Sequence, residues 1–183
     1  MTKRKASYCP DCGSELGSRA FDGRERPHCG DCDRFVYQNP APGGHVVVLD
    51  GAEVLFIERG REPDVGAWAV PGGYLEVDER PAVGAARELE EETGLAVDPG
   101  ALALVRTSLD VDDPDDGSYL SVTFAVERDR TRGRLAPGAE VTDARFWRPG
   151  QLRASDDPTR TVDYRRVAAA VARLRGTALD PSP

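Results

Sequence analysis

The sequence predicts an α/β fold in which a mixed sheet lies between helices, preceded by a small cysteine-rich unit. All four cysteines fall within residues 1–38, which are poor in aliphatic side chains. From His45 onward, apolar β-branched runs of strand length alternate with two segments of helical pattern. Strands mixed with helices in this way are typical of a sheet covered by helices. We therefore expect a unit at residues 1–38, a main domain at 39–176 and a tail at 177–183.

The cysteines form two pairs, and each pair can present two thiolates from one tight turn. The pairs are Cys9 with Cys12 and Cys29 with Cys32, and sixteen residues separate them. Two such turns close a tetrahedral sulfur site that suits Zn²⁺. Because so small a segment cannot build its own core, the zinc would be structural. The alternative is four unrelated buried or redox-active cysteines.

The first half of the main domain is predicted to form a hairpin followed by a helix. Residues 39–44 are rich in proline and glycine and are interpreted as a linker. Two apolar runs, at 45–50 and 53–58, flank a turn at 51–52. A loop at 62–66 precedes a short strand at 68–70, which the Pro-Gly-Gly sequence at 71–73 should end. Residues 80–93 have a helical pattern, with Asp78 as N-cap, Pro81 in the first turn and Gly94 as the stop.

The second half is predicted to contain three more strands and a second helix. Strands at 102–110 and 119–127 flank an acidic loop at 112–117. Another strand is expected at 144–148, and a helix with an alanine-valine face at 163–175.

Composition and charge exclude several classes of protein. The net charge of −8 argues against broad, nonspecific binding of nucleic acid. A local basic patch leaves binding of RNA 5′ ends open, and its members are Lys3, Arg4, Lys5, Arg19, Arg24 and Arg26. No apolar run is long enough for a membrane span, and none follows the basic start, so a cytoplasmic location is expected. The excess of Asp over Lys has two open explanations, GC-rich codon usage and a high-salt cytoplasm.

The helix at 80–93 carries a cluster of carboxylates. Glu88, Glu91 and Glu92 stand at i, i+3 and i+4, so they share one face. Like charges at this spacing repel each other unless a hard cation lies among them, and Mg²⁺ takes oxygen ligands of this kind. Bound Mg²⁺ would neutralise a diphosphate and activate a water molecule for its cleavage. The alternative is a solvated acidic helix face.

Residues 73–95 match every defined position of the Nudix box: Gly73, Glu79, Arg87-Glu88-Leu89, Glu91-Glu92 and Gly94-Leu95. The protein therefore resembles the Nudix hydrolases over roughly residues 40–152. The resemblance implies the Nudix α/β/α sandwich and hydrolysis of a nucleoside diphosphate linked to another moiety. It also implies Mg²⁺, or Mn²⁺, as the cofactor.

The resemblance assigns expected roles to individual residues. Glu88, Glu91 and Glu92 would bind the metal together with the Gly72 carbonyl, and Glu88 is also a candidate general base. Arg87 would orient one of these carboxylates, and Glu79 would support the site. Glu140, in a loop after the box, is the candidate for a further catalytic carboxylate, with a solvated loop residue as the alternative.

The substrate depends on residues outside the box. The zinc ribbon resembles that of proteins similar to ADP-ribose pyrophosphatases, so we expect ADP-ribose or a related dinucleotide such as FAD. NADH and NAD-capped RNA are an alternative, but residues 96–113 lack the Ser-Gln-Pro-Trp-Pro-Phe-Pro-like motif of that subgroup. A non-catalytic nucleotide-sensing regulator is a second alternative. Arg59 and Arg61 are candidates for phosphate contacts, and Trp68, Phe35 and Tyr37 for stacking on a base, each with a structural alternative. The resemblance also implies a homodimer as one assembly.

Overall fold

The structure is a computed structural model that describes residues 6–113 and 117–176. The predicted tail at 177–183, Lys3, Arg4, Lys5 and residues 114–116 of the predicted acidic loop lie outside these residues. The chain divides into two compact units. The first contains the described parts of Met1–Ala41 and Leu109–Leu120, and the second contains the rest. Among the described residues, no helix has the length and apolar character needed to cross a membrane.

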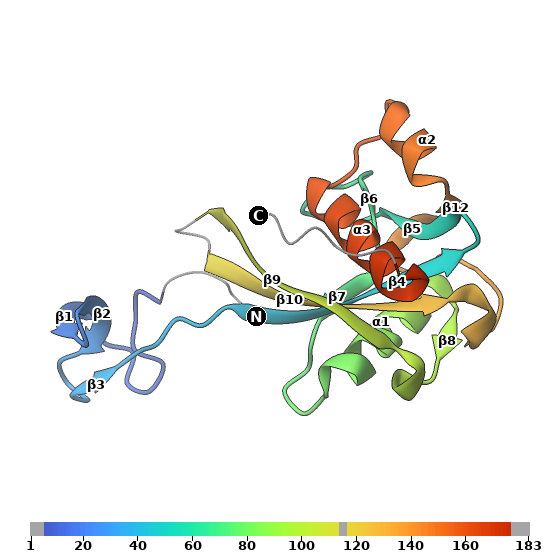
Figure 1. The fold of residues 1–183 in the computed structure, drawn as a ribbon. Helices are drawn as coiled ribbons and strands as arrows, with labels where there is room; N and C mark the ends of the chain where they lie inside the picture. Colours follow the sequence, from blue (N-terminus) through green and yellow to red (C-terminus); the bar gives the residue numbers. More distant parts are fainter. Residues whose placement is uncertain (1–5, 114–116, 177–183) are drawn as a thin grey trace. The chain divides into compact units, whose positions relative to one another are not determined.

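The first unit contains a three-stranded antiparallel sheet in the order β1-β2-β3 (Figure 1). Its strands are β1 (Gly17–Phe21), β2 (Arg24–Cys29) and β3 (Arg34–Phe35). Asp22 and Gly23 join β1 to β2 with φ angles of 52° and 72°. This backbone matches the tight two-residue hairpin turns whose twist agrees with that of the strands.

The second unit is built on a seven-stranded mixed sheet in the order β12-β5-β4-β10-β9, with β6 paired to β5 and β7 paired to β4. Strand β4 is antiparallel to β5, whereas β4 and β10 run in the same direction in Figure 1. A two-stranded sheet joins β8 and β11. The strands are β4 (Ala41–Asp50), β5 (Glu53–Arg59), β6 (Trp68–Ala69), β7 (Gly72–Tyr74), β8 (Ala96–Val97), β9 (Ala103–Asp113), β10 (Gly117–Glu127), β11 (Thr131–Arg132) and β12 (Val141–Trp147).

Helices cover both faces of this sheet, and the residues of β4 alternate between two cores. Val46 and Val48 pack with Leu89 of α1, whereas Val47 and Leu49 pack with Val167 of α3. This arrangement confirms the predicted α/β/α sandwich. The helices are α1 (Pro81–Thr93), α2 (Pro149–Ala154) and α3 (Thr161–Arg175), with 3-10 turns η1 (Pro99–Ala101) and η2 (Arg128–Arg130).

The structure confirms the predicted hairpin, both predicted helices and the Gly94 stop, where φ is 70°. Two predictions about this region were wrong. Residues 41–44 of the expected linker belong to β4, where Gly43 and Gly44 pair with β7. The N-cap of α1 is Arg80, without a side-chain hydrogen bond, and not Asp78. The short strand predicted at 68–70 does end before Pro71, as β6, but the following glycines 72 and 73 form β7, which was not predicted.

Three short elements were missed because their sequence signals are weak. Helix α2 has only six residues, and β8 and β11 have two each, so none of them shows a period. Strands β9 and β12 also extend beyond the runs predicted for them.

Candidate active site

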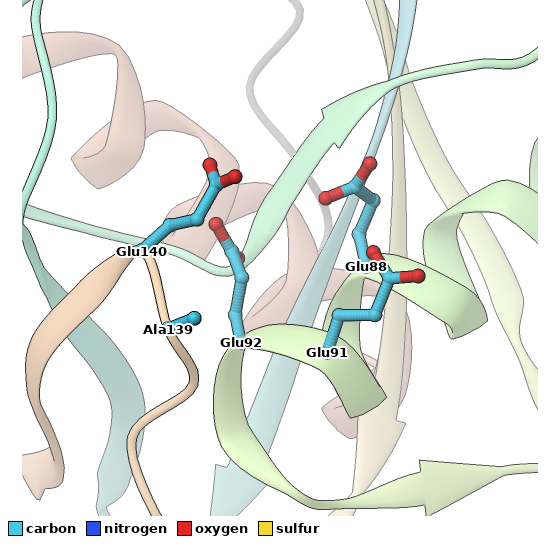
Figure 2. Close-up of a pocket in the computed structure, with 5 residues that line it drawn as sticks. All are labelled: Glu88, Glu91, Glu92, Ala139 and Glu140. Carbon is cyan, nitrogen blue, oxygen red and sulfur yellow. The ribbon is translucent and has the colours of Figure 1, made fainter.

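The carboxylates of α1 line one cavity together with two residues from a loop that is distant in the sequence. Glu88, Glu91 and Glu92 share this cavity, of about 390 Å³, with Ala139 and Glu140 (Figure 2). The opposite face of the helix is buried, with Ala85, Ala86 and Leu89 in the core. Packing of the apolar face therefore fixes which way the carboxylates point. The structure thus brings together the four glutamates that the sequence singled out.

Arg87 connects three carboxylates and one carbonyl around the cavity. Its Nε and Nη2 donate to the two oxygens of Glu79 at 2.8 and 2.9 Å. Its Nη1 donates to Glu88 Oε1 at 2.8 Å and to Glu91 Oε2 at 2.9 Å, and Nη2 also reaches the Tyr74 carbonyl at 3.1 Å. A planar guanidinium can make this set of contacts, whereas a lysine ammonium cannot. The sequence predicted that Arg87 contacts one box carboxylate, but not that it contacts three carboxylates and a carbonyl at once.

Glu79 is held as an anion by its partners. The hydrogen bonds from Arg87, and a further one from the Glu76 N–H at 2.9 Å, lower the pKa of Glu79 to about 2. A charge-assisted bidentate pair of this kind fixes geometry as well as charge. Glu79 therefore anchors Arg87, which in turn orients Glu88 and Glu91.

Glu88 and Glu92 are in a different electrostatic state. Burial raises the pKa of Glu92 to about 8, and the charges of Glu88 and Glu140 add to this, against a hydrogen bond from the Gly72 N–H at 2.8 Å. Burial likewise raises the pKa of Glu88 above its usual value, opposed by Arg87. Buried, mutually repelling carboxylates are the surroundings in which a divalent cation is stabilised. The donor set therefore fits a hard metal ion.

Strand β7 approaches these carboxylates closely, and only glycine permits this. Gly72 has a φ of 151°, and a Cβ there would lie 2.4 Å from both the Gly44 oxygen and His45 Nδ1. A Cβ at Gly73 would lie 2.5 Å from the carboxyl group of Glu88. The two glycines thus let the backbone of β7 lie beside the carboxylates of the cavity.

The loop that carries Glu140 also caps the C-terminal end of α1. The Ala136 N–H donates to the Thr93 carbonyl at 2.9 Å, and the Gly138 N–H donates to the Glu92 carbonyl at 3.0 Å. These bonds satisfy carbonyls that a helix end leaves without partners. A Cβ at Gly138 would lie 1.9 Å from the Glu91 oxygen, so the contact requires glycine. The cap brings Glu140 to the cavity, where its carboxylate forms an ion pair with Arg61.

The residues predicted to contact substrate differ from one another in their surroundings. Arg59 Nε donates to the Pro63 carbonyl at 2.9 Å, and its charge lowers the pKa of Glu92. Trp68 is only 3% exposed and packs edge-on against Trp147, with their ring centroids 5.4 Å apart. Burial of this ring favours the core alternative over stacking on a base. Phe35 and Tyr37 belong to the first unit.

The four cysteines of the first unit cluster as the sequence predicted. Their sulfur atoms all lie within 4.8 Å of one another, with Cys9 and Cys32 at 4.0 Å and Cys12 and Cys29 at 3.5 Å. A Zn–S bond of about 2.3 Å places two sulfurs of a regular tetrahedron roughly 3.8 Å apart. The cluster therefore has the size of a four-sulfur metal site.

Three features of the site were not predicted from the sequence. They are the Tyr74 carbonyl that binds Arg87, the Gly138 contact with α1 and the ion pair of Arg61 with Glu140. The Pro-Gly-Ala sequence at 137–139 indicates a turn, but it does not predict which helix end the turn contacts.

Comparison with known proteins agrees with this geometry. The model of the NUDIX domain family matches residues 40–170. An ADP-ribose pyrophosphatase of Methanocaldococcus jannaschii is 31% identical over 112 residues, which cover 61% of this chain and 64% of that protein. The NAD-capped RNA hydrolase NudC of Vibrio atlanticus is 32% identical over 90 residues, which cover 49% of this chain and 32% of that protein. The matches thus span less than two thirds of these relatives.

Solved structures show the same fold. A NUDIX hydrolase from Nitrosomonas europaea has a TM-score of 0.72 and 24% identity, covering 93% of this chain and 94% of that one. The NUDIX domain of Shewanella oneidensis NrtR, in complex with ADP ribose, has a TM-score of 0.63 and 19% identity, covering 75% of this chain and 90% of that one.

Proposed function

Because the chain belongs to the NUDIX domain family, we propose that it hydrolyses a nucleoside diphosphate linked to a second moiety, with ADP-ribose as the favoured substrate. The convergence of Glu88, Glu91, Glu92 and Glu140 on one cavity carries this proposal. A cavity of about 390 Å³ lies within the range of small-molecule sites. The products from ADP-ribose would be AMP and ribose 5-phosphate.

The proposed cofactor is Mg²⁺ or Mn²⁺, held by Glu88, Glu91, Glu92 and the carbonyl of Gly72. When bound, such an ion would neutralise phosphate charge and lower the pKa of a coordinated water molecule. The raised pKa values of Glu88 and Glu92 support this assignment, because a cation would relieve the burial and repulsion that cause them. Divalent ions of this class take carboxylate and carbonyl oxygens.

The protein side chains would then divide the remaining tasks. Arg87, anchored by Glu79, holds Glu88 and Glu91 in place. Glu88 and Glu140 are the candidates for accepting the proton of the attacking water. Arg61, the partner of Glu140, and Arg59 would meet the phosphates of the substrate.

The choice of ADP-ribose rests on two similarities. A relative is named an ADP-ribose pyrophosphatase, and a structural neighbour was solved with ADP ribose. FAD is the related dinucleotide. Hydrolysis of NADH or NAD-capped RNA is the second candidate, favoured by the match to NudC. A non-catalytic sensor is a weaker candidate, because every carboxylate of the box is present and three of them line the cavity together with Glu140.

We also propose that the four cysteines hold a structural Zn²⁺. The distances between their sulfur atoms fit a tetrahedral ion, and all four ligand positions are taken by protein.

A substrate panel tests the enzymatic proposal. ADP-ribose, FAD, NADH, diadenosine polyphosphates and nucleoside triphosphates would be incubated with the protein and Mg²⁺, and phosphate released by a coupled phosphatase would be measured. We expect ADP-ribose to be turned over fastest and chelation of Mg²⁺ to stop turnover. Faster turnover of NADH would favour the second candidate, and no turnover of any compound would favour the sensor.

A further inference from the structure

One face of the sheet in the first unit carries only aromatic rings and cations on its large side chains. Residues opposite each other in an antiparallel sheet share a face, and alternate residues along a strand do as well. Arg19 lies opposite Arg26, Phe21 opposite Arg24, and His28 opposite Phe35. We call this the aromatic-arginine face, and it consists of Arg19, Phe21, Arg24, Arg26, His28 and Phe35.

The rings on this face form a continuous row. Phe35 lies 4.8 Å from Phe21 and 4.9 Å from His28, centroid to centroid, and Tyr37 extends the row at 6.4 Å from Phe35. Guanidinium groups lie over the rings, with Arg19 5.9 Å from the Phe35 centroid and Arg26 5.2 Å from that of Tyr37. The row therefore offers flat π surfaces beside positive charge.

The ends of the row are open to solvent. Phe21 is 48% exposed and Tyr37 is 54% exposed. Exposed aromatic rings gathered on one face, and not scattered singly, are typical of a binding surface. The strand positions of the face contain no aliphatic side chain, although aliphatic and aromatic groups together usually form the buried centre of a protein–protein interface.

The charge of the face differs from that of the rest of the chain. Glu25 is on the opposite side of the sheet, where Ser18 donates to it at 2.6 Å. Asp33, in the turn before β3, lies at the edge and pairs with Arg19 at 3.0 Å and with His28 at 3.2 Å. Within the described ranges, no carboxylate pairs with Arg24 or Arg26. Arg24 and Arg26 can therefore pair with a negatively charged ligand on this face.

Residues 1–38 contain seven basic and six acidic side chains, but the first unit also contains residues 109–120, which have five Asp and no basic side chain. The first unit as a whole is therefore acidic. A phosphate backbone would be attracted locally, by the arginines of this face.

We propose that the aromatic-arginine face binds single-stranded nucleic acid. Unpaired bases stack on the row of Phe21, Phe35 and Tyr37, while Arg24 and Arg26 pair with the flanking phosphates. Stacking platforms bordered by cations are the common means of binding single strands, since every base has a π face. A duplex hides these faces, so the surface should prefer unpaired strands. The proposal is independent of the hydrolytic activity proposed above.

Fluorescence anisotropy with the full chain tests the proposal, using a labelled oligouridine of about 10 nucleotides. We expect binding that weakens as salt is added. Phe21→Ser should weaken it roughly tenfold through lost stacking. Arg24→Gln should weaken it a few-fold and reduce the salt slope by about one.

Matched controls come from the same unit. Tyr8→Ser removes an exposed aromatic ring outside β1–β3, and Arg34→Gln removes an arginine on the opposite side of the sheet, which pairs with Asp11. Both should leave affinity within about twofold, because exposed side chains away from a binding face contribute little. Zinc content and turnover of the small-molecule substrate, measured in every variant, check that folding and the cavity are intact.

Three results would overturn the proposal. They are absence of binding at low salt, equal losses in the controls, and equal competition by a duplex of the same length. A different outcome is that the wild-type protein binds no oligonucleotide but forms a dimer, and that Phe21→Ser dissociates this dimer. The face would then be a contact between two copies of the chain.

Discussion

The cysteine cluster and the carboxylate cavity differ in what surrounds their ligands. Among described residues 6–40, Cys9 and Cys29 are the only buried apolar side chains. The carboxylates of Glu88 and Glu92 instead project from a helix whose other face is packed in a large core. The first unit would therefore need the proposed zinc to stay folded, whereas packing shapes the carboxylate cavity before any metal binds. Each prediction below tests one side of this contrast.

Removal of zinc should have the largest effect, and it should be confined to the first unit. Binding of a structural zinc contributes roughly 10–16 kcal/mol in comparable small sites, so its loss unfolds them. Cys29→Ser should abolish zinc binding and make residues 1–38 sensitive to protease. Turnover of small substrates should persist, and tryptophan fluorescence should be unchanged, because Trp68 and Trp147 both lie in the second unit.

Asp11→Asn is the matched control for the zinc variant, since it changes an exposed residue between two cysteines without removing a sulfur. It should retain zinc and resist protease. If Cys29→Ser remained folded and protease-resistant, the unit would not depend on a metal.

Glu92→Gln should have the next largest effect, on activity and not on folding. The amide keeps the shape of the side chain but loses the charge that a cation requires. We expect turnover to fall about 100-fold or more, with a similar loss for Glu88→Gln. The thermal midpoint without metal should change little near neutral pH, because the raised pKa of Glu92 already leaves its side chain mostly neutral there and glutamine keeps the same shape. Turnover close to that of the parent in both variants would contradict the site.

Arg87→Lys should cause a smaller loss, because it affects the orientation of the ligands and not their identity. A lysine cannot keep both oxygens of Glu79 and still reach Glu88 and Glu91. We expect turnover to fall by about 10-fold to 100-fold, in the range of lost second-sphere contacts to metal ligands. Raised Mg²⁺ should recover part of the loss. Arg106→Lys, outside the box and the cavity, is the control that should be silent.

The contrast also explains which parts of the site the sequence could predict. Glu88, Glu91 and Glu92 follow from helical spacing, since one helix presents all three. The cysteine cluster follows from the spacing of its pairs. Glu140 was named only by resemblance, because its position depends on backbone bonds from Ala136 and Gly138 to the end of α1. Contacts of this kind join residues more than forty positions apart and leave no local pattern.

The same reason accounts for the errors in the fold. Glycines 43 and 44 were interpreted as a linker, and glycines 72 and 73 only as the stop of the preceding strand, which is the usual meaning of glycine runs. Here they permit close approach of β4, β7 and the Glu88 carboxylate. Trp68 was a candidate for base stacking because periodicity does not distinguish a core ring from a ligand platform.

Magnesium should stabilise the second unit more as pH rises, and this is the smallest effect expected. In the metal-free protein the pKa of Glu92 is raised from 4.5 to about 8, so the folded state binds more protons than the unfolded state between these values. Stability without metal therefore falls as pH rises through this range. Binding of a cation requires the deprotonated carboxylate, so the stabilisation by Mg²⁺ grows over the same range.

Thermal unfolding followed by tryptophan fluorescence isolates this effect, because residues 1–38 contain no tryptophan. The increase in Tm on adding Mg²⁺ should be larger near pH 8 than near pH 6, by a few degrees at most. In Glu92→Gln the increase should be smaller and should lose most of its pH dependence. The same increase in Tm at both pH values in the parent would mean that the cavity does not hold its carboxylates protonated. The burial of Glu92 would then cost less free energy than its raised pKa implies, and the two proposed metal sites would differ less than their surroundings suggest.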